Sequence, residues 1–343
     1  MSSGTIETAI LSPTQENLDW LADWIRKGGV AALPTETVYG LAADALNTGA
    51  LRQIFEIKRR PLYDPLIVHV ENGEKLLEWA EINEDLRRTV LTLIERFSPG
   101  PLTYVLPKKS WVPELLTAGR PTLALRIPAH PLFREILRRS SLALAAPSAN
   151  PFGYLSPTLA RHVRESLGGK LHYILDGGDC TVGLESTILD LSRSPMRILR
   201  PGKITREEIQ SVLPDKEIAG YIHEELDDTV SPMAPGMLRR HYSPRTPLCL
   251  FFKMEELPLA KEENVARVFL SRKDREEVLG NDFFLSEEGD GMQVAKRLFS
   301  LLRELDTSHS YEKIYCQCPP SHGLGTAIAD RLCRAAGLPK KGP

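Results

Sequence analysis

The 343-residue sequence contains few cysteines and no long apolar run. Its five cysteines are widely spaced and form no Cys-x-x-Cys pair, so we predict reduced thiols rather than a disulfide framework. No apolar stretch approaches the roughly 20 residues that a membrane-spanning helix needs. Residues 1–14 lack the basic segment and the apolar run of a signal peptide. Together these absences predict a soluble cytoplasmic protein without a membrane partner.

The sequence also lacks an excess of positive charge and several familiar ligand motifs. Its 43 Lys and Arg residues face 45 Asp and Glu residues, and a net charge of −2 argues against a strongly basic nucleic-acid binder. There is no Gly-x-x-x-x-Gly-Lys-Ser/Thr motif, so ATP would not bind through a P-loop. No His-Glu-x-x-His motif or Cys/His cluster is present, and no side-chain metal cluster is predicted. Residues 323–327 resemble a dinucleotide-binding turn without its third glycine, which we interpret as a strand-to-helix turn.

The chain length predicts two domains joined by a linker. Residues 8–213 alternate short apolar strands with amphipathic helices, which is typical of an α/β domain with one mixed sheet. Residues 214–247 are rich in proline and glycine and lack periodicity, so we predict an extended linker with a task of its own. Residues 248–343 predict a small strand–helix–strand domain.

Hydrophobic periodicity and capping residues predict the individual elements. Helices are predicted over 12–27, 49–58, 86–97, 132–139, 205–212, 292–305 and 327–336. Strands are predicted over 30–33, 66–70, 102–106, 122–127, 142–146, 172–175, 186–191, 197–199, 248–252, 266–270 and 313–317. Four polar clusters coincide with the ends of such strands, where open α/β sheets carry ligand sites. These clusters are 34–40, 58–69, 122–126 and 147–150.

Two of these clusters carry groups suited to phosphate. Lys58 and Arg60 end a helix, and they form either a solvated basic helix end or a phosphate clamp of one point charge and one bidentate fork. Ser148 and Asn150 lie between two prolines. They form either a plain turn or a pair of rigid hydrogen-bonding groups aimed at phosphate oxygens or a bound metal.

Three further polar positions leave two interpretations open. Arg126 ends an apolar strand and needs a carboxylate, which either the protein or a ligand supplies. His69 lies within a strand and is either a satisfied core residue or a functional group. The stretch 185–187 precedes a buried strand and could be an ordinary edge.

Taken in order, seven short motifs resemble the threonylcarbamoyl-AMP synthase family, which is built on a YrdC-like domain. They are PTETVYGL at 34–41, KRR at 58–60, PLIVHV at 65–70, LRIP at 125–128, PSAN at 147–150, ESTILD at 185–190 and LRPG at 199–202. APGM at 234–237 and RHYSP at 240–244 resemble the linker of the long two-domain form of this family. Two positions depart from the family pattern: Arg59 stands where a small residue is usual, and Asp64 stands where Asn is usual.

The resemblance implies a twisted mixed-sheet YrdC-like domain with a large concave cavity, followed by a smaller Rossmann-like α/β domain. It also implies which residues bind ATP, with magnesium held through the ATP phosphates and with Lys58 and Arg60 as catalytic groups. The implied ATP-binding residues are Lys58, Arg60, Asp64, Thr122, Ser148, Asn150, Ser156, Arg200 and Tyr242, and Tyr242 would close over the nucleotide. The implied threonine-binding residues are Thr35, Thr37, His69, Arg126, Ala146 and Ser186.

The activity that the resemblance implies is a nucleotidyl transfer. L-threonine, bicarbonate and ATP would give threonylcarbamoyl-AMP and pyrophosphate, the first step in making the threonylcarbamoyladenosine of tRNA. The product would then pass to downstream tRNA threonylcarbamoyl-transfer machinery, and weak RNA binding is a further partner hypothesis.

Two alternatives stay open. The first is a basic module that binds double-stranded RNA or tRNA through the Lys58–Arg60 element and the run 239–241, against which the net charge counts. The second is carbamoyl transfer to another acceptor, as in maturation proteins that contain a YrdC-like domain. Those proteins carry zinc-finger and acylphosphatase-like modules, which this sequence does not show.

Overall fold

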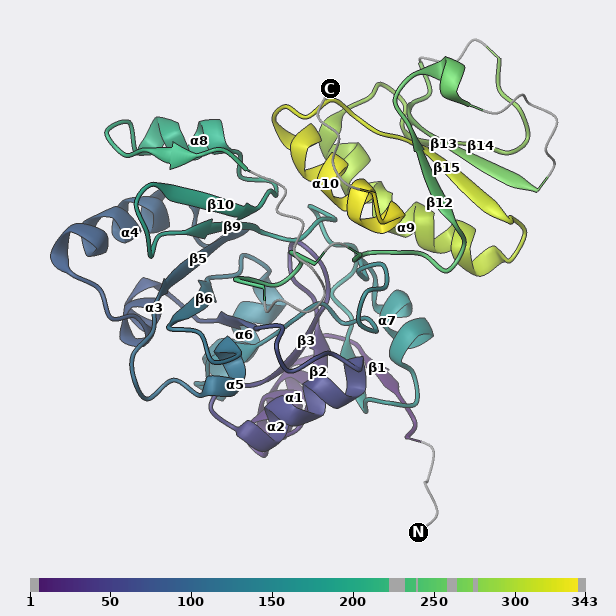
Figure 1. The fold of residues 1–343 in the computed structure, drawn as a ribbon. Coiled ribbons are helices and arrows are strands. Elements are labelled where there is room, and N and C mark those ends of the chain that lie inside the picture. The colour runs from purple at the N-terminus through teal and green to yellow at the C-terminus, as the bar shows by residue number, and fades with distance from the viewer. Residues whose placement is uncertain (1–5, 222–231, 239, 258–263, 274–276, 339–343) are drawn as a thin grey trace.

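The chain forms two β-sheets, each with its own helices (Figure 1). The computed structural model describes residues 6–221, 232–238, 240–257, 264–273 and 277–338. Part of the predicted linker, 222–231 and 239, therefore lies outside the described residues. Among the described helices, none combines the length and the apolar character that crossing a bilayer requires.

The larger sheet is mixed and has eleven strands among the described residues, in the order β1-β8-β2-β3-β7-β4-β6-β5-β9-β10-β11. At its centre, β7 pairs antiparallel with both β3 and β4, and β4 pairs parallel with β6. This register places His69 opposite Arg126. The strands are β1 (Ala9–Leu11), β2 (Ala31–Leu33), β3 (Gly40–Asp44), β4 (Ile67–His69), β5 (Leu102–Pro107), β6 (Thr122–Arg126), β7 (Leu144–Ala145), β8 (Tyr173–Leu175), β9 (Thr187–Asp190), β10 (Met196–Arg200) and β11 (Ile218–Ala219).

Helices pack on this sheet through apolar stripes. In α1, for example, Leu18, Leu21 and Ile25 are buried, and Thr14 caps the helix by accepting from the Asn17 amide. The helices of the large domain are α1 (Gln15–Arg26), α2 (Thr48–Lys58), α3 (Gly73–Trp79), α4 (Glu84–Phe97), α5 (Glu114–Thr117), α6 (Pro131–Ser140), α7 (Ala160–Leu167) and α8 (Arg206–Val212).

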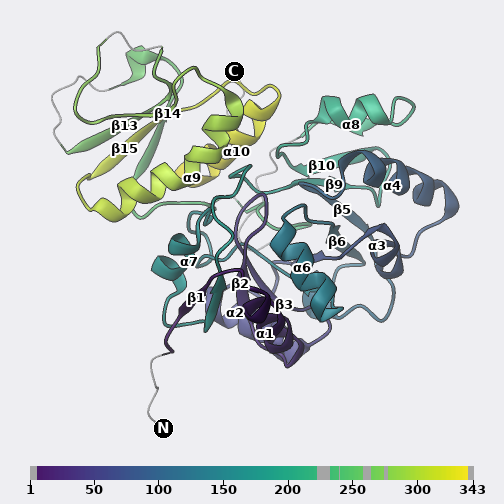
Figure 2. The ribbon, with the colours of Figure 1, turned by 180° about the vertical axis from the view of Figure 1, so that it is seen from behind.

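The smaller sheet is entirely parallel, with the order β12-β15-β13-β14. Figures 1 and 2 show α9 and α10 between this sheet and the large domain. The small domain can therefore contribute side chains to the large one. Its elements are β12 (Leu248–Phe251), a short 3₁₀ helix (Met254–Glu256), β13 (Val265–Ser271), β14 (Asp282–Ser286), α9 (Gly291–Ser308), β15 (Lys313–Gln317) and α10 (Leu324–Ala336).

The predicted fold class is confirmed, and each predicted helix and strand overlaps an observed one. The sequence prediction missed several elements that carry weak local signals. Helix α7 is preceded by Leu159, whose side chain cannot cap it, and α3 begins with Gly73, a poor helix former. The strands missed are β1, β3, β11 and β14. Strands β1 and β11 have only three and two residues, so they offer few alternating positions. Strand β11 lies inside the predicted linker, where it pairs with β10 and extends the sheet.

Candidate functional site

A buried cavity forms where β4, β6 and β7 end and the linker folds over them. Its free volume is about 50 Å³. Ligand pockets for small molecules commonly have about 300–1,000 Å³, and this one is small because linker side chains occupy its mouth. It is lined by Thr37, Val38, Arg60, Ile67, His69, Arg126, Ala146, Pro147, Ser148, Glu185, Ser186, Arg200, Pro235, Gly236, His241 and Tyr242.

Lys58 joins the helix α2 to the loop that contains Ser148 and Asn150. Helix α2 ends at Lys58 because Arg59 adopts a left-handed conformation, with φ of 53°. The Lys58 Nζ atom donates to the Ser148 carbonyl oxygen at 2.5 Å and to the Asn150 carbonyl oxygen at 2.6 Å. Burial, aided by the nearby Arg60 charge, lowers the pKa of Lys58 well below its usual value. A buried amine that is easily neutralised is poised to gain charge when an anion arrives. The solvated interpretation of this helix end is therefore wrong.

Arg60 and Asp64 form a buried ion pair in the next loop. The Arg60 Nη2 atom lies 2.8 Å from Asp64 Oδ2 and donates to the Pro65 carbonyl oxygen at 2.7 Å. Burial raises the pKa of Asp64, while Arg60 and Lys58 oppose that shift. Oδ2 of Asp64 is thus paired with Arg60, whereas the buried Oδ1 atom has no hydrogen-bond partner among the described residues. Buried polar atoms normally have partners, so this Oδ1 atom is a candidate for contact with a bound ligand or cation.

Arg200 closes the same side of the cavity from β10. Its Nε and Nη2 atoms donate to the carbonyl and hydroxyl oxygens of Ser186, at 3.1 and 3.2 Å. Its Nη1 atom donates to the linker carbonyl of Pro235 at 3.2 Å. The Ser186 hydroxyl is also 2.7 Å from the Thr103 hydroxyl. Arg200 on β10 therefore connects Pro235 of the linker to Ser186, which directly precedes β9.

Arg126 meets a protein carboxylate, which settles one of the open alternatives. Its Nη2 atom donates to Glu36 Oε1 at 2.7 Å, and its Nη1 atom donates to the Thr37 hydroxyl at 3.0 Å. Burial would raise the pKa of Glu36, but the Arg126 charge prevails and the pKa is lowered. Thr35 supports this corner through a 2.7 Å contact between its hydroxyl and that of Thr37. Arg126 still lines the cavity, so the ion pair positions its guanidinium at the cavity wall.

His69 and Asn150 are buried polar groups with an unused atom. His69 is 2% exposed, and its Nδ1 atom has no hydrogen-bond partner among the described residues. Burial, with help from Arg126, lowers the pKa of His69 to about 3, so the imidazole is neutral. The Asn150 amide donates to two carbonyl oxygens, whereas its Oδ1 atom has no partner in the same part of the chain. His69 is therefore not a fully satisfied core histidine.

The linker covers the cavity with His241 and Tyr242. Tyr242 is 1% exposed and has a φ of 62°, an unusual value for a tyrosine. Its ring lies 4.1 Å from that of His241 and 5.6 Å from that of Phe299 on α9. Gly236, with φ of 81°, packs so closely that an added Cβ would lie 2.4 Å from the Tyr242 hydroxyl. The linker is thus in a closed arrangement.

The structure brings fourteen of the fifteen predicted site residues to one region. Nine line the cavity, and five touch a lining residue or its neighbour in the same loop. Thr122 is the exception, because it begins β6 whereas Arg126 ends it, about 13 Å further along the strand. The nine are Thr37, Arg60, His69, Arg126, Ala146, Ser148, Ser186, Arg200 and Tyr242, and the five are Thr35, Lys58, Asp64, Asn150 and Ser156.

Sequence reasoning gave no role to three charged groups at this site, Glu36, Glu185 and Arg331. Glu36 lies in the PTETVYGL motif shortly after a buried strand, and Glu185 begins the ESTILD motif shortly before one. An acidic residue so close to a buried strand was the signal that could have indicated a role. Glu185 lines the cavity, and its carboxylate accepts from Ser156 and Arg331. Arg331 lies on α10 of the other domain, and nothing local in the sequence indicates this contact.

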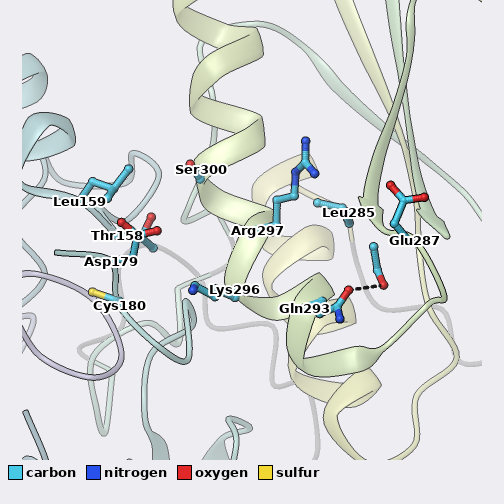
Figure 3. A pocket seen from close by; sticks show the side chains of 11 residues that line it. Thr158, Leu159, Asp179, Cys180, Leu285, Glu287, Gln293, Lys296, Arg297 and Ser300 are labelled. Carbon is cyan, nitrogen blue, oxygen red and sulfur yellow. Dashed lines mark hydrogen bonds between the residues drawn. The ribbon is translucent and has the colours of Figure 1, made fainter. Parts of the chain in front are cut away.

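A second cavity, of about 330 Å³, lies between α9 and the loops of the large domain (Figure 3). Figure 3 shows Lys296 pointing from α9 towards Asp179 and Cys180. Its charged residues, including Arg297 and Glu287, are exposed, and it contains none of the predicted site residues. We therefore take the smaller cavity, where buried cations and unused polar atoms converge, as the candidate functional site.

The mixed sheet and its cation-lined cavity define a YrdC-like protein. The family model described as "Telomere recombination" matches residues 23–202, and the model "Threonylcarbamoyl-AMP synthase, C-terminal domain" matches residues 204–337. The threonylcarbamoyl-AMP synthase of Pyrococcus abyssi is 38% identical, over 96% of this chain and 98% of the relative. That of Bacillus subtilis is 37% identical, over 95% of each chain. The chain therefore belongs to the threonylcarbamoyl-AMP synthase family.

Structural similarity extends over both domains. The crystal structure of P. abyssi Sua5 complexed with L-threonine matches with a TM-score of 0.85 and 36% identity, over 96% of this chain and 98% of the other. The arrangement of the two sheets is thus shared with that protein.

Proposed function

We propose that this chain is a nucleotidyltransferase that makes threonylcarbamoyl-AMP and pyrophosphate from L-threonine, bicarbonate and ATP, for the modification of tRNA. The observation that carries this proposal is that Arg60, Arg200 and Ser148 line one cavity, while Lys58 donates to the loop that contains Ser148 and Asn150. Full-length relatives bear the corresponding enzyme name, and one similar structure holds L-threonine.

The cationic part of the cavity suits the triphosphate. The amine of threonine and bicarbonate form a carbamate with loss of water, as the new C–N bond replaces a C–O bond, and a carbamate oxygen attacks the α-phosphorus of ATP. The new O–P bond replaces the bond to the β-phosphate oxygen, and pyrophosphate leaves with that electron pair. Lys58, Arg60 and Arg200 would stabilise the charge on the leaving pyrophosphate, so catalysis rests on positioning and electrostatics without a protein nucleophile.

The part of the cavity around Arg126 suits a small amino acid. Arg126 offers a guanidinium fixed by Glu36, and the hydroxyl-bearing residues Thr37 and Ser186 also line the cavity. Arg126 would face the threonine carboxylate, while the neutral His69 can accept a hydrogen bond at its unused nitrogen. We propose this part of the cavity as the threonine subsite.

Magnesium fits the phosphate side of the cavity. The buried Oδ1 atoms of Asp64 and Asn150 have no hydrogen-bond partner among the described residues, and Mg²⁺ prefers oxygen ligands. Among the same residues, no group of three or more His, Cys, Asp or Glu side chains forms a metal site. We propose that Asp64 and Asn150 lie beside a magnesium ion held mainly by ATP phosphates, which would help to neutralise the triphosphate. This would also explain how an aspartate is tolerated at position 64.

Substrate entry requires the linker to move. The cavity of about 50 Å³ has no room for ATP while Gly236, His241 and Tyr242 occupy its mouth. A carbamate decays readily in water, so closure after binding would protect it. We propose that the linker opens to admit ATP and closes over the bound substrates.

The RNA-binding alternative has less support. Lys58 is 1% exposed and Arg60 is 7% exposed, so neither offers its charge to an RNA backbone at the surface. Passage of the product to tRNA threonylcarbamoyl-transfer machinery and a location in the cytoplasm stay predictions.

Pyrophosphate release from ATP tests the proposal. Release should require both L-threonine and bicarbonate, and omission of either should reduce it to background. Replacing threonine by serine tests the amino-acid subsite, and replacing bicarbonate by carbamoyl phosphate tests the carbamoyl-transfer alternative. Release that persists without threonine would contradict the proposed reaction.

A further inference from the structure

Arg331 extends from the small domain to the wall of the cavity. It lies on α10 and is 1% exposed. Its Nε atom donates to Glu185 Oε2 at 2.7 Å, and its Nη2 atom donates to the Pro201 carbonyl oxygen at 3.0 Å. Its guanidinium carbon lies 5.2 Å from the centre of the Tyr242 ring. One side chain thus touches three separate segments that border the site.

Each of these contacts leads directly to a residue of the site. Glu185 lines the cavity, and its other oxygen accepts from the Ser156 hydroxyl. Pro201 follows Arg200 at the end of β10. Tyr242 covers the cavity from the linker. Arg331 therefore connects the groups proposed to contact the nucleotide without lining the cavity itself.

We propose that Arg331 is a positioning residue for ATP, supplied by the small domain. This inference rests on the proposed function. Glu185 is an acid in a cavity that must receive a triphosphate, and Arg331 neutralises it. Removing Arg331 would leave a buried, unpaired carboxylate facing the ATP phosphates, which both desolvation and repulsion oppose.

The contacts of Arg331 require a guanidinium. Nε, Nη1 and Nη2 donate in three directions, to Glu185, Asp330 and Pro201. A lysine would keep the charge but cannot donate to three groups fixed in this planar arrangement. The position therefore needs both the charge and the shape of arginine.

The same helix also holds the linker backbone. Arg334 Nη1 donates to the carbonyl oxygens of Met237 and Leu238, at 2.7 and 2.6 Å. Asp330 accepts from Arg331 at 2.7 Å and from Arg334 at 3.0 Å, which keeps the two arginines in fixed relative positions. Helix α10 therefore contacts both Glu185 in the cavity wall and the backbone of the linker that covers the cavity.

The test compares R331M with R267M. Arg267 is 8% exposed and forms a 2.7 Å ion pair with Asp282 inside the small domain, away from the cavity. It is therefore a matched control for the loss of a buried arginine. Calorimetric ATP binding, thermal melting and threonine-dependent pyrophosphate release are measured for both variants and for the wild type.

We expect R331M to raise the Kd for ATP by about 10- to 100-fold, the range seen when a residue supporting a ligand group is removed. R267M should lower thermal stability and leave the Kd unchanged. The double variant R331M/E185Q should return the Kd close to that of E185Q, since no unpaired carboxylate remains. A folded R331M with a wild-type Kd, or a failure of E185Q to restore binding, would overturn the proposal.

A second pair of variants decides the question if R331M does not fold. R331K should then raise the Kd for ATP above the wild-type value, while R267K should not. Equal affinities for R331K and the wild type would overturn the role of Arg331. A wild-type protein that binds ATP but releases no pyrophosphate would refute the proposed function alone, whereas one that fails to bind ATP would refute both.

Discussion

Gly236 is the point at which the linker meets the cavity most closely, so Gly236→Ala is a sharp test of linker closure. The added Cβ would lie 2.4 Å from the Tyr242 hydroxyl and 3.2 Å from the Arg200 Cδ and Nη1 atoms. The Tyr242 ring has little freedom to move, because Arg331, His241 and Phe299 surround it. The substitution therefore opposes the closed arrangement directly.

Two costs combine at this position. Gly236 has a φ of 81°, and a left-handed conformation costs a residue with a Cβ about 1–2 kcal/mol. Overpacking of a tight contact costs about 1–3 kcal/mol. The sum, about 2–5 kcal/mol, corresponds to a shift of about 30- to 4,000-fold away from the closed arrangement. Local relaxation will relieve part of this, so we expect kcat/KM to fall by at least about 10-fold.

Threonine-dependent pyrophosphate release measures this effect, with Gly220→Ala as the control. Gly220 lies in the same predicted linker, has no positive φ, and an added Cβ would have no atom within 4 Å. Gly220→Ala should keep wild-type turnover, and both variants should keep the thermal stability of the two domains. Wild-type turnover in a folded Gly236→Ala variant would refute the idea that this close contact is part of the active arrangement.

Three further predictions concern the charges of the cavity. Lys58→Met and Arg60→Met should each lower turnover by about 10²- to 10³-fold, the effect of removing one charge-stabilising group. The control Arg52→Met, on the exposed side of α2, should keep wild-type turnover. Unchanged turnover in Lys58→Met and Arg60→Met would show that these two residues have no catalytic role. Burial lowers the pKa of Lys58 and a bound triphosphate would raise it again, so at pH values between these two pKa values ATP binding should take up a proton and strengthen as pH falls. Calorimetry in buffers of different ionisation enthalpy detects that uptake, which Lys58→Met should abolish. The ion pair with Arg126 stabilises the folded protein fully at pH values above the unfolded-state pKa of Glu36. That stabilisation is lost as the pH falls through the lower, folded-state pKa of Glu36. Glu36→Gln should therefore reduce the free energy of unfolding at pH 7 by about 1–3 kcal/mol. The difference should shrink below about pH 4 in urea titrations, and a pH-independent difference would contradict the ion-pair explanation.

The fold was largely predictable where local signals are strong. Strands β4 and β6 are apolar runs next to prolines, and the α1 and α8 termini carry capping residues at Thr14 and Thr205. Strand β3 was missed because it begins at Gly40, directly after a stretch that is typical of a turn. Such strands form because neighbouring strands supply their hydrogen-bond partners, and this information is not local.

The site was predictable as a set of residue types but not as a network. The Arg126 partner Glu36 lies 90 positions away in the sequence, and the Glu185 partner Arg331 lies 146 positions away. A basic residue that ends a helix is usually solvated, and only the fold buries Lys58 against the loop of Ser148. Motif order indicated which residues matter, whereas the pairing of charges depended on tertiary structure.

Direct detection of the product tests the central claim that this cavity joins a threonine carbamate to the α-phosphate of ATP. The protein is incubated with ATP, Mg²⁺, L-threonine and ¹³C-labelled bicarbonate, and the mixture is analysed by mass spectrometry. We predict a threonylcarbamoyl-AMP ion that carries the isotopic label, that disappears when threonine is omitted and that forms about 10²- to 10³-fold more slowly in Lys58→Met. Pyrophosphate release without any labelled adduct would contradict the account.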